Sequence, residues 1–63
     1  MNNTYAKTQF AIGIPKAKFN QLTNKWFPAI GGAIKPTSEH NTIELATKEA
    51  VTDLENHNTE GWL

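Results

Sequence analysis

The side chains that could take part in catalysis or metal binding are few, and their spacing matches no catalytic pattern. His40 and His57 lie far apart, without the H-x-x-x-H spacing that puts two ligands on one helix face. Ser38 lies near His40, but outside the G-x-S-x-G turn that exposes a serine nucleophile. We therefore expect exposed histidines, no metal, no cofactor and no enzymatic activity.

The remaining chemical candidates are carboxylates and a glycine pair. Glu49, Asp53 and Glu55 have helical spacing, which is typical of a solvated helix face. The pair Gly31–Gly32 precedes Lys35, but the phosphate-loop spacing is absent and a proline, not a helix, follows the lysine. A bend or bulge in a strand is the expected role of these glycines.

Basic and acidic residues are segregated along the chain. All basic residues except Lys48 lie within residues 1–36, and all six acidic residues lie after them. The net charge is zero because the chain has six residues of each sign. Lys16 and Lys18 would begin a helix, where free N–H groups attract anions, so they are candidate anion-binding residues. Nucleic acid is therefore an alternative partner, although the chain has no arginine to read base edges.

The length of 63 residues predicts a single domain, residues 1–63. So short a chain buries little surface, and without cysteine it has no disulfide to stabilise it. A protein partner or self-association is expected for this reason. Because the chain has no long apolar run and no secretory signal, we expect no membrane partner and a cytoplasmic location.

Hydrophobic periodicity predicts the first two elements. Residues 4–14 alternate in polarity, which predicts a half-buried strand that ends at Pro15. Apolar residues then recur at steps of three and four, which predicts an amphipathic helix over residues 16–26. Pro28 prevents this helix from continuing.

The second half of the chain leaves more than one interpretation open. Residues 29–35 predict a strand with Ile30 and Ile34 inward, although its glycine pair could form a turn instead. After a polar loop, residues 42–46 predict a strand and residues 47–57 a helix. One helix over residues 42–57 is the rival, and Leu45 argues against it because that helix would expose it. Residues 58–63 are expected to form a tail or a short last strand.

This order, β-α-β-β-α with an optional final β, predicts an α+β fold with a small antiparallel sheet and both helices on one face. A split βαβ, ferredoxin-like arrangement is the nearest analogy, and it carries no function with it. The opposite face would then be bare and rich in small residues. We expect that face and the tail to bind a partner through Ala11, Gly13, Gly31, Ala33, Trp62 and Leu63.

Taken together, these patterns predict a small non-catalytic protein-binding module that acts by occupying a partner surface, as an inhibitor, adaptor or small subunit. A nucleic-acid-binding protein and a homo-oligomeric structural protein are the alternatives. The abundance of asparagine, threonine and lysine without arginine is typical of AT-rich genomes, and suggests a phage origin. Docking of the terminal Trp62 on its own domain is the alternative to its role as a partner anchor.

Overall fold

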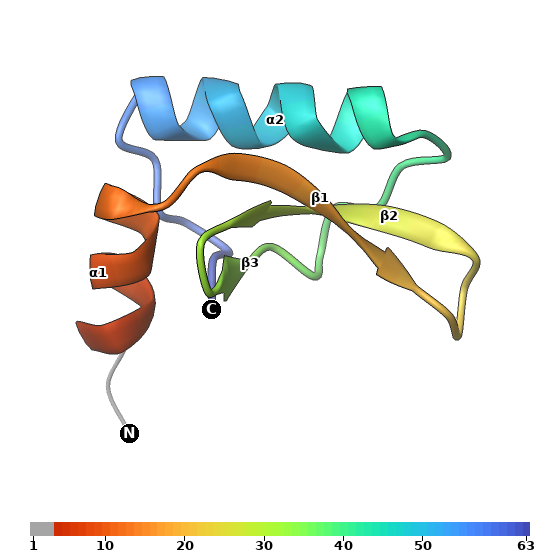
Figure 1. Cartoon of the computed structure of the whole chain (residues 1–63), viewed down its shortest axis with the longest axis horizontal. Helices are drawn as coiled ribbons and strands as arrows, with labels where there is room; N and C mark the ends of the chain where they lie inside the picture. Colours follow the sequence, from red (N-terminus) through yellow and green to blue (C-terminus); the bar gives the residue numbers. More distant parts are fainter. Residues whose placement is uncertain (1–3) are drawn as a thin grey trace.

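The computed structural model describes the backbone of residues 4–63 and the side chains from Thr8 onward. Its elements follow the order α-β-β-β-α (Figure 1). They are α1 (Thr4–Ile12), β1 (Pro15–Asn20), β2 (Lys25–Ile30), β3 (Ala33–Ile34) and α2 (Ile43–Glu55). The strands form one antiparallel sheet in the order β1-β2-β3. The α+β class is thus confirmed, but the predicted element order is wrong and the three-stranded sheet does not have the split βαβ topology.

The predicted helix over residues 16–26 is instead the hairpin of β1 and β2. Phe19 lies directly opposite Trp26, and their ring centroids are 5.0 Å apart. The loop between the strands ends at Asn24, whose φ of 59° is in the left-handed region that asparagine tolerates. Two aromatic residues seven positions apart fit one helix face, but they also meet across a hairpin, so periodicity alone led to the wrong element.

The predicted strand over residues 4–14 is instead the helix α1. As a helix it places Phe10 against Trp62 in the core, a contact between distant segments that the short alternation of polarity does not reveal. The helix buries Phe10, whereas Ile12 and Ile14, which the strand would have turned inward, are 73% and 77% exposed. Gly13 ends the helix against Gly31, where an added Cβ would lie 2.4 Å from the Gly31 nitrogen. Only glycine permits this close approach.

The rival interpretation of residues 42–57 is the correct one, because α2 is a single helix. Thr42 caps it, accepting a hydrogen bond at its hydroxyl oxygen from the Leu45 N–H at 3.2 Å. Leu45 is 50% exposed, so the helix does tolerate the exposure that argued against it. Ala46 and Ala50 are fully buried, and their small side chains let α2 pack closely on β1 and β2.

The predicted strand over residues 29–35 is divided by a turn at the glycine pair. Gly31 has a φ of 58°, which favours glycine at the first position of a two-residue hairpin loop. Ala29 lies opposite Ile34 and Ile30 opposite Ala33, so Ile30 and Ile34 occupy opposite faces of the sheet instead of both pointing inward. The alternative of a glycine turn is therefore correct.

Pro28 lies in the middle strand of the sheet, where proline is rare. Its carbonyl accepts a hydrogen bond from the Lys35 N–H, but it has no N–H to donate in return. The chain leaves the sheet after Lys35 and rejoins it at His40, which exchanges two backbone hydrogen bonds with Trp26. The loop between these residues brings polar side chains towards α2.

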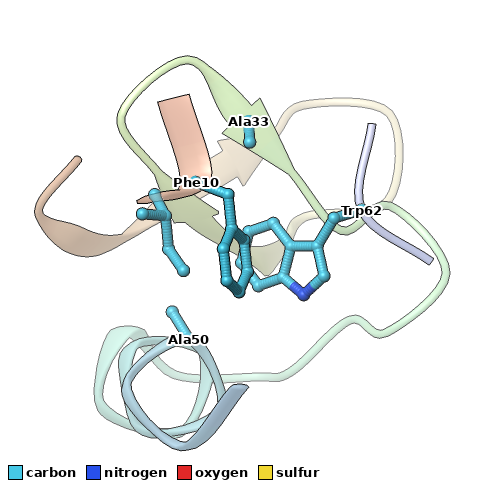
Figure 2. Packing of buried hydrophobic residues seen from close by; sticks show 5 residues of the cluster. Phe10, Ala33, Ala50 and Trp62 are labelled. Atoms are coloured by element: carbon cyan, nitrogen blue, oxygen red, sulfur yellow. The ribbon is translucent and has the colours of Figure 1, made fainter. Parts of the chain in front are cut away.

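The core lies between α2 and the sheet and is closed by residues from both ends of the described chain. Phe10 and Trp62 meet edge to face at 5.0 Å between centroids, next to Ile30, Ala33 and Ala50 (Figure 2). The backbone of Leu63 exchanges two hydrogen bonds with Ile34. Residues 62 and 63 therefore dock on their own domain, and Leu63 pairs with β3 as a strand residue would.

Candidate functional site

The antiparallel register assigns each strand residue to one of two faces, because residues directly opposite each other share a face. Ile30 and Ala33 belong to the face that packs against Ala50 of α2 (Figure 2). We call the other side the open face. It carries the exposed Lys16, Lys18 and Leu63, the half-buried Ile34, and the buried Phe27 and Ala29.

A hollow of about 390 Å³ lies against the open face. Its lining includes Lys16, Lys18, Ala29, Gly31, Gly32 and Ile34. The glycines of the β2–β3 turn and Ala29 have no long side chains to fill it, so the backbone of the sheet forms part of its floor. The hollow thus combines a small apolar floor with two cationic side chains.

Lys16 and Lys18 carry the charge of this face. Both are exposed, and none of the ion pairs in the described part of the chain includes them. The expectation that they begin a helix is wrong, since they lie on β1 two residues apart, with both side chains on the open face. Their candidate role in binding an anion therefore rests on the sheet and not on a helix N-terminus.

The outer edge of β1 is free of hydrogen-bond partners among residues 4–63. Backbone groups of Trp26 and Pro28 bond to His40 and Lys35, on the side of β2 where β3 lies, so by alternation those of Phe27 and Ala29 point towards β1. Lys18 lies opposite Phe27 and Lys16 lies opposite Ala29, so the backbone groups of these two lysines bond to β2. The N–H and C=O groups of Ala17 and Phe19 consequently point away from the sheet, and no backbone hydrogen bond in the described chain uses them.

The side chains that could take part in acid–base or nucleophilic chemistry lie on the opposite side of the sheet, between α2 and the loop after β3. Glu49 Oε1 accepts a hydrogen bond from Ser38 Oγ at 2.6 Å and lies 2.6 Å from His40 Nε2. A nucleophilic triad needs the serine to bond to the histidine, and here both groups bond to the same carboxylate oxygen. This cluster joins the loop to the helix and contains no activated nucleophile.

Lys35 joins the same cluster through two carboxylates. Its Nζ lies 2.8 Å from Glu49 Oε2 and 2.7 Å from Asp53 Oδ2, and Asp53 Oδ2 also accepts a hydrogen bond from Trp62 Nε1 at 2.9 Å. Burial alone would lower the pKa of Lys35, but the hydrogen bonds and negative charges of Asp53 and Glu49 outweigh it and raise the pKa. Lys35 therefore stays protonated, and its charge is paired with two carboxylates.

The pKa of Glu49 is lowered from 4.5 to about 2. Burial acts in the opposite direction, but hydrogen bonds from Lys35, Ser38 and His40 and the positive charge of Lys35 outweigh it. Glu49 and Asp53 were expected to form a solvated helix face, and this was wrong because Lys35 and Trp62 cover them. Their four-residue spacing was visible in the sequence, but it does not reveal that Lys35 is their partner.

The six residues expected to bind a partner do not form one surface. Ala11 is exposed on α1, whereas Gly13 and Gly31 contact each other at the junction of α1 with the β2–β3 turn. Ala33 and Trp62 are buried on the helix-covered side, so neither is available to a partner in this structure. Ala46 is buried as well, and the bare small-residue face predicted from the sequence therefore does not exist.

Of the predicted partner residues, Gly31 and Leu63 do reach the open face. Gly31 lines the hollow, and Leu63 is 59% exposed beside Ile34. Ile34 also lies on this face, although its place in an apolar run predicts a core position. The alternation of β1 with Lys16 and Lys18 at every second position was the signal that could have found the face.

Comparisons with protein-family models, curated proteins and solved structures gave no match for this chain. Within residues 4–63, no group of three or more histidine, cysteine, aspartate or glutamate side chains could hold a metal ion. No helix in this part of the chain is long and apolar enough to cross a membrane. The function must therefore be inferred from the geometry of the open face.

Proposed function

We propose that this chain is a non-catalytic protein-binding module, an inhibitor, adaptor or small subunit that uses its open face to occupy the surface of another protein. One observation carries the proposal: two exposed lysines, which take part in no ion pair among the described side chains, border a hollow on the sheet face that α2 leaves uncovered. Ile34 and Leu63 supply apolar surface beside them, a combination suited to an acidic partner surface with an apolar centre.

The arrangement of polar groups favours binding over catalysis. The cluster around Glu49 is committed to holding the loop and α2 together, since its carboxylate already bonds to Lys35, Ser38 and His40. The open face presents lysines, small residues and aliphatic side chains, none of which forms an acid–base pair. A surface of this kind can bind a partner but has no group to transform it.

Nucleic acid is the second candidate, because Lys25 lies on the same face as Lys16 and Lys18. Three lysines would attract phosphates, and such binding weakens steeply as salt rises. The face has small residues at its centre in place of exposed stacking aromatics, since Phe27 is buried. Titration of a fluorescent single-stranded oligonucleotide at low and moderate salt tests this candidate, and we expect no saturable binding.

The proposed function is tested by photo-crosslinking from defined positions. Benzoylphenylalanine replaces Lys18 on the open face in one variant and the exposed Thr52 on α2 in a control variant. After irradiation in an extract of the source organism, we expect a discrete protein adduct from position 18 that excess unlabelled wild-type protein suppresses. Adducts from position 52 alone, or none from either position, would contradict the proposal.

A further inference from the structure

We infer that the segment bound at this site is an extended acidic strand, which adds to the outer edge of β1 and places carboxylates on Lys16 and Lys18. This inference rests on the proposed function and specifies the chemistry and geometry of the partner. Peptides commonly bind sheets in this way, with main-chain hydrogen bonds supplying affinity and alternate side chains supplying specificity.

The backbone of β1 offers the hydrogen-bonding groups that such a strand needs. Ala17 and Phe19 direct both their N–H and C=O groups away from β2, and the described chain leaves them unpaired. Pro15 begins the strand and has no N–H, which is the position where an edge strand accommodates proline. The free edge therefore offers the N–H and C=O groups of Ala17 and Phe19 and the carbonyl of Pro15.

The side chains of β1 define the partner sequence. An antiparallel strand that bonds to Ala17 and Phe19 places its other residues directly opposite Lys16 and Lys18. These are the pairs of the ladder that exchange no hydrogen bonds, in which the two side chains lie closer together. Glutamate or aspartate at those positions would pair with the two lysines. The residues opposite Ala17 and Phe19 point to the other face beside an exposed phenylalanine, so apolar side chains fit there. The expected motif alternates acidic and apolar residues.

A second copy of this chain fits the same edge poorly. Antiparallel pairing of β1 with itself about Ala17 would place Lys16 of each copy opposite Lys18 of the other, and like charges directly opposite each other destabilise a strand pair. Nucleic acid fits the edge poorly for a different reason, because ionised phosphate oxygens only accept hydrogen bonds and would leave the outward carbonyls of Ala17 and Phe19 without a donor. The edge and the lysines together select an acidic polypeptide.

The first test uses an acetylated and amidated hexapeptide of alternating glutamate and valine. Its matched control is the same peptide with methylated valine nitrogens, which keeps the charge and the side chains but removes the hydrogen bonds that the peptide donates to the β1 carbonyls. We expect the unmodified peptide to bind, and methylation to weaken binding at least ~10-fold, because the outward carbonyls of Ala17 and Phe19 lose their donors. Equal affinity of the two peptides would overturn the inference.

The second test follows backbone amide exchange by NMR at saturating peptide. The amides of Ala17 and Phe19 should become protected at least ~10-fold, whereas those of Lys16 and Lys18, which already bond to β2, should change little. Lys16→Gln with Lys18→Gln should weaken binding about 3- to 30-fold, and Lys48→Gln should not.

The two proposals can fail separately. If Ala17 and Phe19 stay unprotected while Lys16→Gln abolishes the position-18 crosslink, the strand geometry is wrong and the binding module stands. If position 18 gives no protein adduct, the proposed function is wrong whatever the hexapeptide does. Absence of hexapeptide binding under low-salt conditions would also overturn the strand inference.

Discussion

The two sides of the sheet use the same residue type in opposite ways. On the helix-covered side, Lys35 contacts two carboxylates within 2.8 Å, and one of them also bonds to the buried Trp62. On the open face, Lys16 and Lys18 have no acidic partner in the described chain. The comparison indicates that one lysine is used to hold the fold together, whereas the other two are available for binding.

The largest effect is expected from removing the tryptophan that anchors the covered side. Trp62→Ala removes the edge-to-face contact with Phe10 and the hydrogen bond to Asp53, and should cost about 3–5 kcal/mol of unfolding free energy. A domain of this size has only a few kcal/mol of stability, so the variant should be largely unfolded at 25 °C by circular dichroism.

Leu63→Ala is the matched control for this prediction, because Leu63 is exposed and its pairing with Ile34 uses only backbone atoms. It should cost less than about 1 kcal/mol in urea denaturation. A Trp62→Ala variant as stable as this control would show that the covered side does not depend on the C-terminal residues.

A smaller loss is expected when the covered lysine is removed. Lys35→Met leaves Glu49 and Asp53 close together without a cation, and should lower the unfolding free energy by about 1–3 kcal/mol, since the site is only partly buried. Lys48→Met at an exposed position of α2 is the control and should stay within about 0.5 kcal/mol. If Lys35→Met and Lys48→Met lower the unfolding free energy equally, Lys35 does not stabilise the fold more than an exposed lysine does.

Acidification should lower the unfolding free energy because it protonates Glu49 on the covered side of the sheet. Its pKa is about 2 when folded and about 4.5 when unfolded, so the unfolded chain binds more protons between these values and stability falls as the pH falls through this window. The shift corresponds to about 3 kcal/mol at most, and solvent screening of this partly exposed pair reduces it to about 1–2 kcal/mol.

Urea denaturation at pH 6 and at pH 2.5 measures this acid effect. Glu49→Gln should be less stable than wild type at pH 6 and should lose less stability on acidification. If both proteins lose the same stability between these pH values, the carboxylate of Glu49 is not the group responsible.

The smallest effect on stability is expected on the open face. Lys16→Gln with Lys18→Gln removes no ion pair of the described chain, so the unfolding free energy should change by less than about 0.5 kcal/mol. Binding of the acidic hexapeptide should weaken in the same variant. A loss of stability comparable to that of Lys35→Met would indicate that these lysines serve the fold and not a partner.

Some parts of this fold could be predicted because the signal is local. Thr42 before an apolar periodic stretch indicates a helix start, and a glycine pair between Ile30 and Ala33 indicates a tight turn. Both interpretations were available as alternatives, and both are correct. The preferred choices failed because the helix does expose Leu45 and because the apolar run over residues 29–35 turns at its glycine pair.

Other parts depended on contacts between distant segments. Phe19 and Trp26 have the spacing of a helix face, but their rings pair across a hairpin and their strands are covered by α2. The open face was expected to be bare because of alanines, yet Ala33 and Ala46 are buried and two lysines define the face instead. Whether such a segment forms a helix or a pair of strands depends on the element that packs against it.

By itself, the sequence determined the α+β class, the absence of disulfides, the segregation of charge, and the turn that the glycine pair Gly31–Gly32 allows. These features depend on composition and on neighbouring residues, whose conformational preferences act locally. Only the tertiary structure decided which lysines are neutralised. Lys35 meets Glu49 and Asp53 because the chain folds back over α2, whereas the pairing of β1 with β2 turns Lys16 and Lys18 away from every acid described.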